Sequence, residues 1–268
     1  MSDELKVLYS IQLILKETGY FDVSRISKEI LDFSKKEGID LEKILKRIQK
    51  NEPWEYIRGS TDFLGYPFIV NRNVLIPRTE TEQLVTIAKG FLDENNSCTH
   101  IIDVGTGSGC IIISLAKILC GRNKYKFLGI EDNKSALEVA RKNSALHKVN
   151  EKVFLIKQNL LSGTKIEEDT LIIANLPYVP KYLYNGLDKS VKDYEPKRAI
   201  VGGTDGLKYY KKLLKQVSNK NHLGRKVTLL IEIEPSTIGN LVNLLENKDF
   251  KIIKDFRGRE RFLLISLP

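Results

Sequence analysis

A glycine-rich segment preceded by an acidic residue is the part of the sequence that most directly indicates chemistry. Gly105, Gly107 and Gly109 alternate directly after the apolar run His100–Val104, and a helical pattern begins at Cys110. Glycines between a strand and a helix let the backbone turn tightly and approach a ligand without interference from Cβ atoms. The spacing is not that of a nicotinamide-dinucleotide fingerprint, because the sixth position of that motif is Cys110. The segment predicts a loop that binds a different cofactor.

Two acidic residues narrow the identity of that cofactor. Asp103 lies two residues before the first glycine, where a carboxylate is unsuited to a pyrophosphate but suits the cationic amino-acid end of S-adenosylmethionine. Glu131 ends the next apolar run, where an acid can accept hydrogen bonds from both hydroxyls of a ribose. The structural alternative is that Glu131 and Asp132 only cap the following helix. We favour S-adenosylmethionine as the cofactor.

The segment Asn175-Leu176-Pro177-Tyr178 carries groups suited to holding a planar nitrogen. The nitrogen of a carboxamide or an adenine amino group is a poor nucleophile because its lone pair is delocalised. The Asn175 side-chain oxygen can accept one hydrogen of this nitrogen, and the Leu176 carbonyl can accept the other. The carbonyl is available because the backbone of a residue before proline is extended. Pro177 stiffens the loop and Tyr178 offers a flat surface. The segment predicts methyl transfer through positioning and electrostatics, although a strand-ending turn explains the same residues structurally.

The elements that must position these residues alternate between strand and helix. Repeated units of this kind imply a parallel sheet with right-handed crossovers, and two late runs imply a closing antiparallel hairpin. The carboxyl ends of successive strands then bring together the glycine loop, Glu131, Asn159 and Asn175, at the edge where open sheets bind ligands. The expected strands are 100–104, 127–131, 153–157, 171–174, 228–232, 250–256 and 261–267, and the expected helices are about 110–119, 134–146 and 206–218.

The first part of the chain is organised differently. Apolar residues recur with helical spacing in three short stretches, with Asp40 as a candidate N-cap and Gly38 as a candidate stop. The stretch 63–70 predicts a hairpin, and Thr79 with Glu82 predicts a capping box at the start of the next helix. We divide the chain into a helical bundle at 1–56, a hairpin linker at 57–78 and a sheet domain at 79–268.

Composition limits the class of protein. With 268 residues, 42% of them hydrophobic, the chain can bury one core and a small satellite domain. No stretch approaches the roughly 20 apolar residues that span a bilayer, and the start lacks a signal-peptide pattern, so we expect a cytoplasmic protein without membrane contact. The 43 basic and 34 acidic residues give a net charge of +9, which suits a polyanion such as RNA or an acidic protein face, or reflects lysine-rich composition alone.

The cysteines and histidines indicate no metal site. The three cysteines lack CxxC spacing, and the histidines lack the spacing of metal ligands. We therefore expect no metal. The residues are Cys98, Cys110 and Cys120, and His100, His147 and His222.

Taken together, these motifs resemble the class I S-adenosylmethionine-dependent N-methyltransferases, and more narrowly the HemK/PrmC family, which methylates a glutamine of peptide chain release factors at N5. Asp103–Gly109 and Asn175–Tyr178 carry the wider resemblance. The narrower one covers most of the chain and is carried by Glu52–Gly59, Val74–Glu82, Tyr194–Pro196, Gly202–Gly206 and Arg257–Arg261. The resemblance implies a Rossmann-like α/β sheet, mostly parallel with a C-terminal antiparallel hairpin, plus a small N-terminal helical domain.

The resemblance also implies roles for individual residues. The helical domain would help to bind a class 1 release factor, and methylation would fall on the glutamine of its Gly-Gly-Gln motif, with no need for nucleic acid. Asn175, Pro177 and Tyr178 would be catalytic, and Asn175, Leu176, Pro177 and Tyr178 would bind the substrate. The cofactor would contact Gly105, Thr106, Gly107, Ser108, Gly109, Glu131, Asn159, Leu160 and Asn175.

Three departures from the family's pattern accompany the match. Leu176 replaces a proline, Asn159 and Leu160 replace an acid and an aromatic residue, and Glu131 replaces aspartate. Asn-Leu-Pro-Tyr is itself similar to the motif of the rRNA adenine N6-methyltransferases, so that activity is an alternative. Methylation of a ribosomal-protein glutamine is another, and a non-catalytic binding module is a third. About a hundred residues precede the glycine loop, an order that favours the release factor over rRNA.

Overall fold

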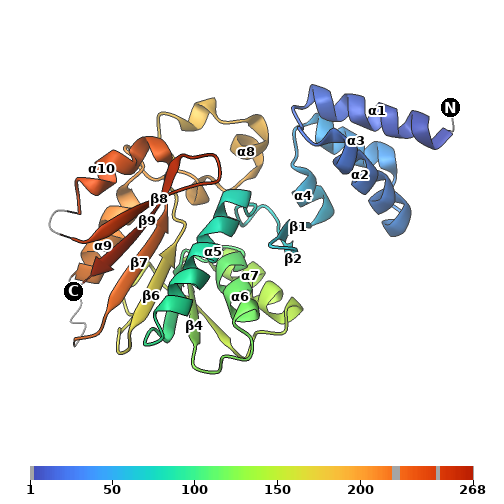
Figure 1. The fold of residues 1–268 in the computed structure, drawn as a ribbon. Helices are drawn as coiled ribbons and strands as arrows, with labels where there is room; N and C mark the ends of the chain where they lie inside the picture. Colours follow the sequence, from blue (N-terminus) through green and yellow to red (C-terminus); the bar gives the residue numbers. More distant parts are fainter. Residues whose placement is uncertain (1–2, 219–223, 246–247, 268) are drawn as a thin grey trace.

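A seven-stranded mixed sheet forms the centre of the protein (Figure 1). The computed structural model describes residues 3–218, 224–245 and 248–267. The strands are β1 Ser60–Phe63, β2 Tyr66–Ile69, β3 His100–Val104, β4 Lys126–Glu131, β5 Val153–Lys157, β6 Thr170–Ala174, β7 Val227–Glu232, β8 Phe250–Lys254 and β9 Glu260–Leu267. The helices are α1 Asp3–Glu17, α2 Val23–Glu37, α3 Leu41–Gln49, α4 Trp54–Arg58, α5 Thr79–Glu94, α6 Cys110–Ile118, α7 Lys134–Leu146, α8 Lys189–Tyr194, α9 Lys208–Ser218 and α10 Ile238–Val242.

The strand order of the large sheet is β5-β4-β3-β6-β7-β9-β8. The first five of these strands run parallel, and β9 lies antiparallel between β7 and β8. This arrangement confirms the predicted parallel sheet with an antiparallel end. The order of the strands places the carboxyl ends of β4, β3 and β6 side by side, with β7 next to β6.

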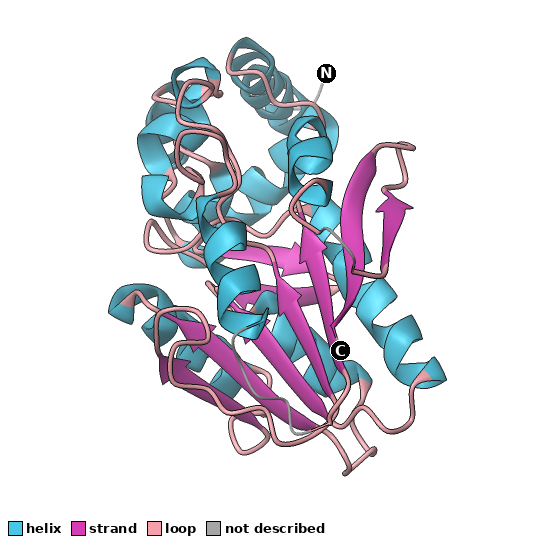
Figure 2. Cartoon of the chain, turned by 90° about the vertical axis from the view of Figure 1, so that its left-hand side faces the viewer, coloured by secondary structure: helices cyan, strands magenta, loops and turns pink. Residues whose placement is uncertain are grey.

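Helices cover both faces of the sheet (Figure 2), because alternate strand residues point to opposite sides. In β6, Leu171 and Ile173 join a cluster that includes residues of α5 and α6, whereas Ile172 and Ala174 join a cluster that includes residues of α9 and α10. All four side chains are fully buried. Such strands read as continuous apolar runs because both of their faces are covered.

The helices before the hairpin form a separate cluster around Trp54. Asp40 caps α3 by accepting a hydrogen bond from the Glu42 N–H at 2.9 Å, and Gly38 ends α2 in the left-handed conformation, as the sequence predicts. Ile57, which the sequence analysis places in the linker, packs in this helical cluster. The proposed boundaries at residues 56 and 78 stay predictions.

The helical part contacts the sheet part through an apolar cluster that joins Tyr56 of α4 to Ala136 and Val139 of α7, and through a few polar side chains. The Tyr194 hydroxyl at the end of α8 donates to the Lys50 carbonyl at 2.8 Å. Arg72 donates to the buried Glu52 carboxylate at 2.9 Å and stacks on the Tyr194 ring. Glu52 also accepts two hydrogen bonds from Arg47 of α3. These contacts fix the orientation of the helices relative to the edge of the sheet that carries the site.

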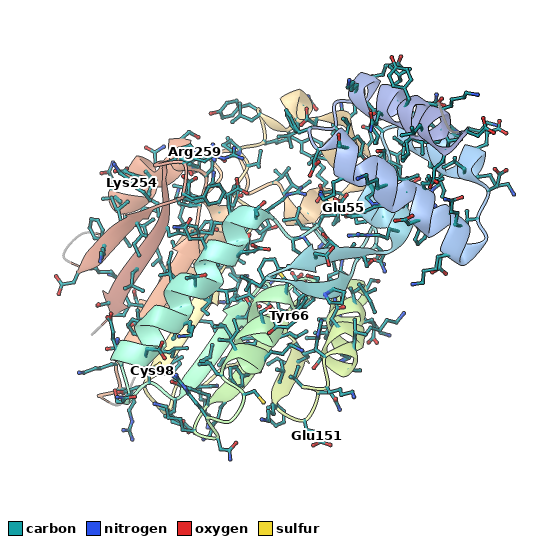
Figure 3. The ribbon with its side chains drawn as sticks, turned by 45° about the vertical axis from the view of Figure 1, so that its right-hand side comes forward. Glu55, Tyr66, Cys98, Glu151, Lys254 and Arg259 are labelled. Carbon is teal, nitrogen blue, oxygen red and sulfur yellow. The ribbon has the colours of Figure 1, made fainter. Side chains whose placement is uncertain are left out.

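The capping box predicted for α5 is wrong. Thr79 is the first residue of the helix, and Arg78 precedes it without a side-chain cap. The Glu82 carboxylate instead accepts a hydrogen bond from the Leu64 N–H at 2.8 Å, in the turn of the β1–β2 hairpin. The Glu82 side chain therefore reaches from α5 to the β1–β2 turn, where it pairs with a backbone N–H. The hairpin is therefore attached to α5, and its Tyr66 ring lies against His147 beyond α7 (Figure 3).

Candidate active site

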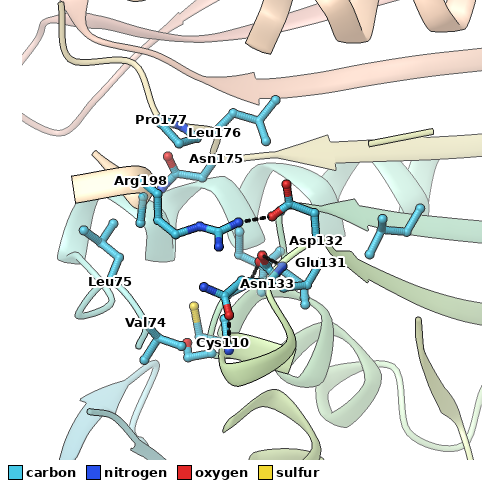
Figure 4. A pocket seen from close by; sticks show the side chains of 18 of the residues that line it. Val74, Leu75, Cys110, Glu131, Asp132, Asn133, Asn175, Leu176, Pro177 and Arg198 are labelled. Atoms are coloured by element: carbon cyan, nitrogen blue, oxygen red, sulfur yellow. Dashed lines mark hydrogen bonds and ion pairs between the residues drawn. The ribbon is translucent and has the colours of Figure 1, made fainter. Parts of the chain in front are cut away.

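A cavity of about 310 Å³ opens at the carboxyl ends of β3, β4, β5 and β6. Ligand sites in open α/β sheets lie along this edge. Most of the predicted site residues line the cavity: Gly105, Thr106, Gly107, Ser108, Glu131, Asn159, Leu160, Asn175, Leu176 and Pro177. Figure 4 shows Asn175, Leu176 and Pro177 on one side of it and Glu131 to Asn133 on the other, with Arg198 reaching Asp132 between them.

Two predicted residues, Gly109 and Tyr178, do not line the cavity. Gly109 precedes α6 with a φ of +84°, and a Cβ atom there would lie 2.6 Å from Ile113 and 3.4 Å from the Ala140 side chain of α7. Glycine is required at this position because α6 and α7 pack closely beneath the loop. The Tyr178 ring does not provide the flat surface expected in the cavity. Its hydroxyl instead donates to the Glu232 carboxylate at 3.4 Å. The aromatic residue that lines the cavity is Tyr209.

The glycine loop is held against β4 through Glu131. One Glu131 oxygen accepts the Gly107 N–H at 3.0 Å and the other accepts the Asn133 N–H at 2.9 Å. Burial raises the pKa of this carboxyl. The side chain that caps α7 is Asn133, which accepts the Ser135 N–H at 2.8 Å. Each Glu131 oxygen keeps a further lone pair, and the carboxylate remains half-buried at the cavity wall.

Asp103 does not meet the cavity, which corrects the expectation that it faces the cationic end of the cofactor. It is fully buried beneath the loop, and one of its oxygens accepts a hydrogen bond from the Thr106 hydroxyl at 2.5 Å. Its other oxygen has no hydrogen-bond partner within the described parts of the chain. Burial raises the pKa of Asp103 to about 7. The residue therefore orients the loop from below.

The raised pKa of Asp103 predicts a pH-dependent stability difference for Asp103→Asn. In the unfolded chain the carboxyl loses its proton near pH 4, whereas in the folded chain it retains the proton until about pH 7. The wild type therefore loses stability relative to the asparagine variant as pH rises through this window, and the difference levels off above it. Since one pKa unit corresponds to about 1.4 kcal/mol, the stability of the wild type relative to the variant should fall by up to about 4 kcal/mol between pH 4 and pH 8. Urea unfolding at pH 4, 6 and 8 measures the difference, and a value that does not change with pH would contradict the assignment.

The turn after β5 forms another wall. Leu160 adopts a φ of +50°, which is unfavourable for a residue with a side chain, and it is buried between the core and the cavity. Gln158, which sequence reasoning missed, supports this turn by donating from Nε2 to the Leu160 carbonyl at 2.8 Å. Asn159 is exposed, and its side-chain oxygen accepts a hydrogen bond from Lys212 of α9. Its amide nitrogen lies 3.4 Å from Asp132.

Two residues that the sequence analysis did not identify hold the Asn175 side chain. Its amide nitrogen Nδ2 donates to Thr81 Oγ1 at 2.9 Å and to Glu232 Oε2 at 3.0 Å. The Thr81 hydroxyl in turn donates to the same Glu232 oxygen at 2.9 Å. Thr81 and Glu232 are buried, and burial raises the pKa of Glu232 to about 7. An acid at the carboxyl end of β7 parallels Glu131 at the end of β4, which is the sequence signal that could have identified Glu232.

The backbone of Leu176 is held by a buried tyrosine. The Leu176 N–H donates to the Tyr210 hydroxyl at 3.1 Å, and that hydroxyl also lies 3.1 Å from the Leu176 carbonyl. The hydroxyl has a single proton, and the Glu232 carbonyl is a second acceptor within its reach. Tyr210 is nearly completely buried, so α9 fixes the loop after β6 in addition to packing on the sheet. A carbonyl oxygen has two lone pairs, so Leu176 keeps one acceptor position.

The loop after β6 is also braced by residues 200–206. Val179 pairs with Val201, and the Gly202 N–H donates to the Val179 carbonyl at 2.9 Å. A Cβ atom on Gly202 would lie 2.4 Å from the Pro177 carbonyl oxygen and 2.5 Å from that of Gly206. Both neighbours are backbone atoms, so they cannot rotate aside. Glycine at this position is therefore required by the close approach of the two loops.

This close approach predicts that Gly202→Ala displaces the loop. We expect the free energy of unfolding to fall by about 2 kcal/mol, the usual cost of overpacking, and the catalytic rate to fall about tenfold. Gly239→Ala in α10 is the matched control, because a Cβ atom there would meet nothing within 4 Å. That control should leave activity unchanged and stability equal or slightly higher. Chemical unfolding and turnover measured on both variants test the expectation, and equal behaviour of the two would refute it.

Segments distant in sequence complete the wall on the α5 side. Arg78 lines the cavity and pairs with the buried Glu195 carboxylate at 2.5 Å. Glu195 also accepts the Ile76 N–H at 3.2 Å. Arg259, in the turn between β8 and β9, lies 3.8 Å from Glu80 of α5 (Figure 3). The conformation of residues 74–82 is thus fixed from two sides.

The two histidines that the structure describes, His100 and His147, lie outside the lining of the cavity. His147 Nε2 lies 2.8 Å from the Pro67 carbonyl, and burial lowers the pKa of His147 and of His100. His222 lies outside the described residues. Within the described ranges, no three His, Cys, Asp or Glu residues are grouped as metal ligands. In the same ranges, every helix is too short or too polar to cross a bilayer.

Comparisons with known proteins identify relatives of this chain. A family model described as a methyltransferase domain matches residues 95–172. A release factor glutamine methyltransferase of Flavobacterium psychrophilum is 32% identical over 98% of this chain and 93% of its own length. One of Bacteroides thetaiotaomicron is 34% identical over 84% of this chain and 79% of its own. The catalytic domain of hMettl16, solved with the MAT2A 3'UTR hairpin 6, is similar in fold, with a TM-score of 0.55, 15% identity and 74% of each chain covered.

Proposed function

The chain belongs to the release factor glutamine methyltransferases, and on this premise we propose that its cavity brings S-adenosylmethionine and a release factor glutamine together. It is an enzyme that methylates the glutamine nitrogen N5 in the Gly-Gly-Gln motif. The observation that carries the proposed site is Asn175, whose amide nitrogen is held by buried groups on the side away from its oxygen. A carboxamide substrate needs such an acceptor beside the methyl donor.

The residues around the cavity fit S-adenosylmethionine. Glu131 presents acceptors for ribose hydroxyls, and a Cβ atom on Gly107 would meet nothing closer than 3.9 Å, so the loop borders open space. Leu160 supplies an apolar wall and Asn159 a polar rim for an adenine. Bound there, S-adenosylmethionine would supply a methyl group on a positively charged sulfur, and transfer would leave a neutral thioether and release one proton from the nitrogen. Each cofactor contact is a proposal for the residue concerned.

The loop after β6 would orient the substrate. The Asn175 oxygen would accept one hydrogen of the glutamine amide and the Leu176 carbonyl would accept the other. Two acceptors in fixed positions turn the nitrogen lone pair toward the donor and favour the pyramidal nitrogen of the transition state. Tyr210 and Glu232 hold these acceptors without facing the cavity themselves. Pro177, which lines the cavity, limits the mobility of the loop.

The helical part of the chain would contribute to binding a class 1 release factor. Tyr9 and Leu13 of α1 are 58% and 43% exposed. They lie four residues apart on one helix, and so on one face of it. The contacts of Tyr194 and Arg72 with this part give it a fixed position relative to the cavity. A partner bound to the helices would therefore be presented to the site in a constant orientation.

Incubation with labelled S-adenosylmethionine tests the proposed function. We expect one methyl group on the glutamine of the Gly-Gly-Gln motif of a recombinant class 1 release factor. A release factor with alanine in place of that glutamine is the control and should stay unlabelled. Label on ribosomal RNA or on a ribosomal protein would assign one of the two alternative substrates, and no label on any of them would contradict methyl transfer.

A further inference from the structure

The orientation of the Asn175 carboxamide determines whether the site can accept a hydrogen bond from a substrate amide. The oxygen and the nitrogen of this group have nearly the same shape, yet only the oxygen can accept a hydrogen from a substrate amide. In the structure the nitrogen donates to the buried Thr81 and Glu232. The oxygen has no hydrogen-bond partner among the described residues, and it is not one of the fully buried polar atoms that lack a partner. It is therefore the atom left accessible at the cavity wall.

The two partners of the nitrogen differ in what they can enforce. A threonine hydroxyl both donates and accepts, so Thr81 would tolerate either orientation of the carboxamide. The Glu232 oxygen Oε2 also accepts from the Thr81 hydroxyl and so serves as an acceptor, and a rotated Asn175 would place its own oxygen about 3 Å from it, acceptor against acceptor. The Thr81 hydroxyl, which donates to the same carboxylate oxygen, completes a closed set of three hydrogen bonds. Glu232 thus discriminates between the two orientations, and Thr81 does not.

We propose that Glu232 is the positioning residue that fixes the Asn175 oxygen toward the substrate. This inference rests on the proposed function and adds to it the residue on which the substrate-binding geometry depends. Glu232 does not line the cavity, so its side chain acts through the groups that it holds, of which Asn175 carries the oxygen proposed to bind the substrate. Its place at the end of β7, beside β6, allows it to reach the first residue after β6.

The surroundings of Glu232 supply donors and a cation for its carboxylate. The Tyr178 hydroxyl donates to its second oxygen at 3.4 Å. Arg261 of β9 opposes the effect of burial on its pKa, whereas Glu80 of α5 adds to it. Arg261 is itself held by the Asp255 carboxylate at 3.0 Å. Each oxygen of Glu232 is therefore occupied by donors, as its task as an acceptor requires.

Four variants test the proposal, with kcat and the KM for S-adenosylmethionine measured on a release factor. In Glu232→Gln the side chain offers both a donor and an acceptor, so the preference for one Asn175 orientation weakens. We expect kcat to fall about tenfold and KM to stay within about threefold. In Asn175→Asp two carboxylates would meet at 3.0 Å, and we expect kcat to fall about a hundredfold. The double variant replaces that repulsion with an amide donor facing a carboxylate.

The double variant should therefore be about tenfold more active than Asn175→Asp alone. If Glu232 had only a structural role, the two losses would multiply and the double variant would be the least active. Activity of the double variant at or below that of Asn175→Asp overturns the proposal, as does a larger loss in Thr81→Val than in Glu232→Gln. The matched control is Glu138→Gln, an exposed glutamate of α7. A wild-type chain that methylates no release factor would instead overturn the proposed function and this inference with it, which separates the two failures.

Discussion

Replacing Asn175 with alanine is expected to lower methyl transfer about a thousandfold or more, because the substrate amide loses the acceptor that orients its nitrogen. Donor affinity should change by less than about tenfold, or about 1.4 kcal/mol, since the glycine loop and Glu131 remain in place. The side chain lies at the cavity wall, and its nitrogen is held by Thr81, which also lines the cavity, and by Glu232, which does not. Alanine removes the oxygen and leaves a space that the buried pair does not fill.

Single-turnover rates with saturating S-adenosylmethionine, together with calorimetric titration of the donor, separate the two effects. Asn240→Ala, an exposed position in α10, is the matched control and should behave as the wild type. Turnover of the Asn175 variant close to the wild-type value would remove this residue from the mechanism. A donor affinity that falls together with the rate would mean that the substitution disturbs the whole edge of the sheet.

Replacing Glu131 with alanine is expected to have its effect on the cofactor instead. Two hydrogen bonds to a charged acceptor would be lost, so the dissociation constant for S-adenosylmethionine should rise a few hundredfold, about 3.4 kcal/mol. The Gly107 and Asn133 N–H groups would also lose their partner, which loosens the loop. Glu131→Gln retains one acceptor and should lie between alanine and the wild type.

Equilibrium binding of the donor to these variants measures the effect without any release factor present. Glu151→Ala is a suitable control, because this glutamate is exposed in the turn before β5 (Figure 3). An unchanged dissociation constant in Glu131→Ala would show that the ribose is bound elsewhere.

The sheet could be predicted because each strand is recognisable from the residues of its own short segment. Runs such as Leu171–Ala174 are apolar at every position, as strands covered on both faces must be, and their alternation with helices implies parallel order. The glycine loop, Glu131 and Asn175 follow such runs directly, so their common edge was predictable as well. Short elements without a strong apolar pattern, α8 and α10 among them, were not identified.

The residues that sequence reasoning missed come from segments far from the motifs that they support. Thr81, Asn175 and Glu232 meet only because α5, β6 and β7 are adjacent in the folded chain. Tyr210 lies on α9, and only the tertiary structure brings its hydroxyl to Leu176. No spacing rule connects such positions.

The wrong expectations have a common physical cause. The sequence shows that a polar side chain stands beside a motif, but it does not show on which side of the backbone the side chain lies. Asp103 lies within β3 and points beneath the loop, and Tyr178 points toward β7. Glu82 was predicted to cap its own helix. It instead accepts a hydrogen bond from the Leu64 N–H in the nearby hairpin.

The position of β9 affects how this protein can be made. β9 is inserted between β7 and β8, and the Glu232 that holds Asn175 ends β7 beside it. During synthesis, β7 therefore keeps an unpaired edge until residues 260–267 have left the ribosome. A chain that lacked β9 would leave this edge of β7 unpaired beside Glu232, and would so weaken the support behind Asn175.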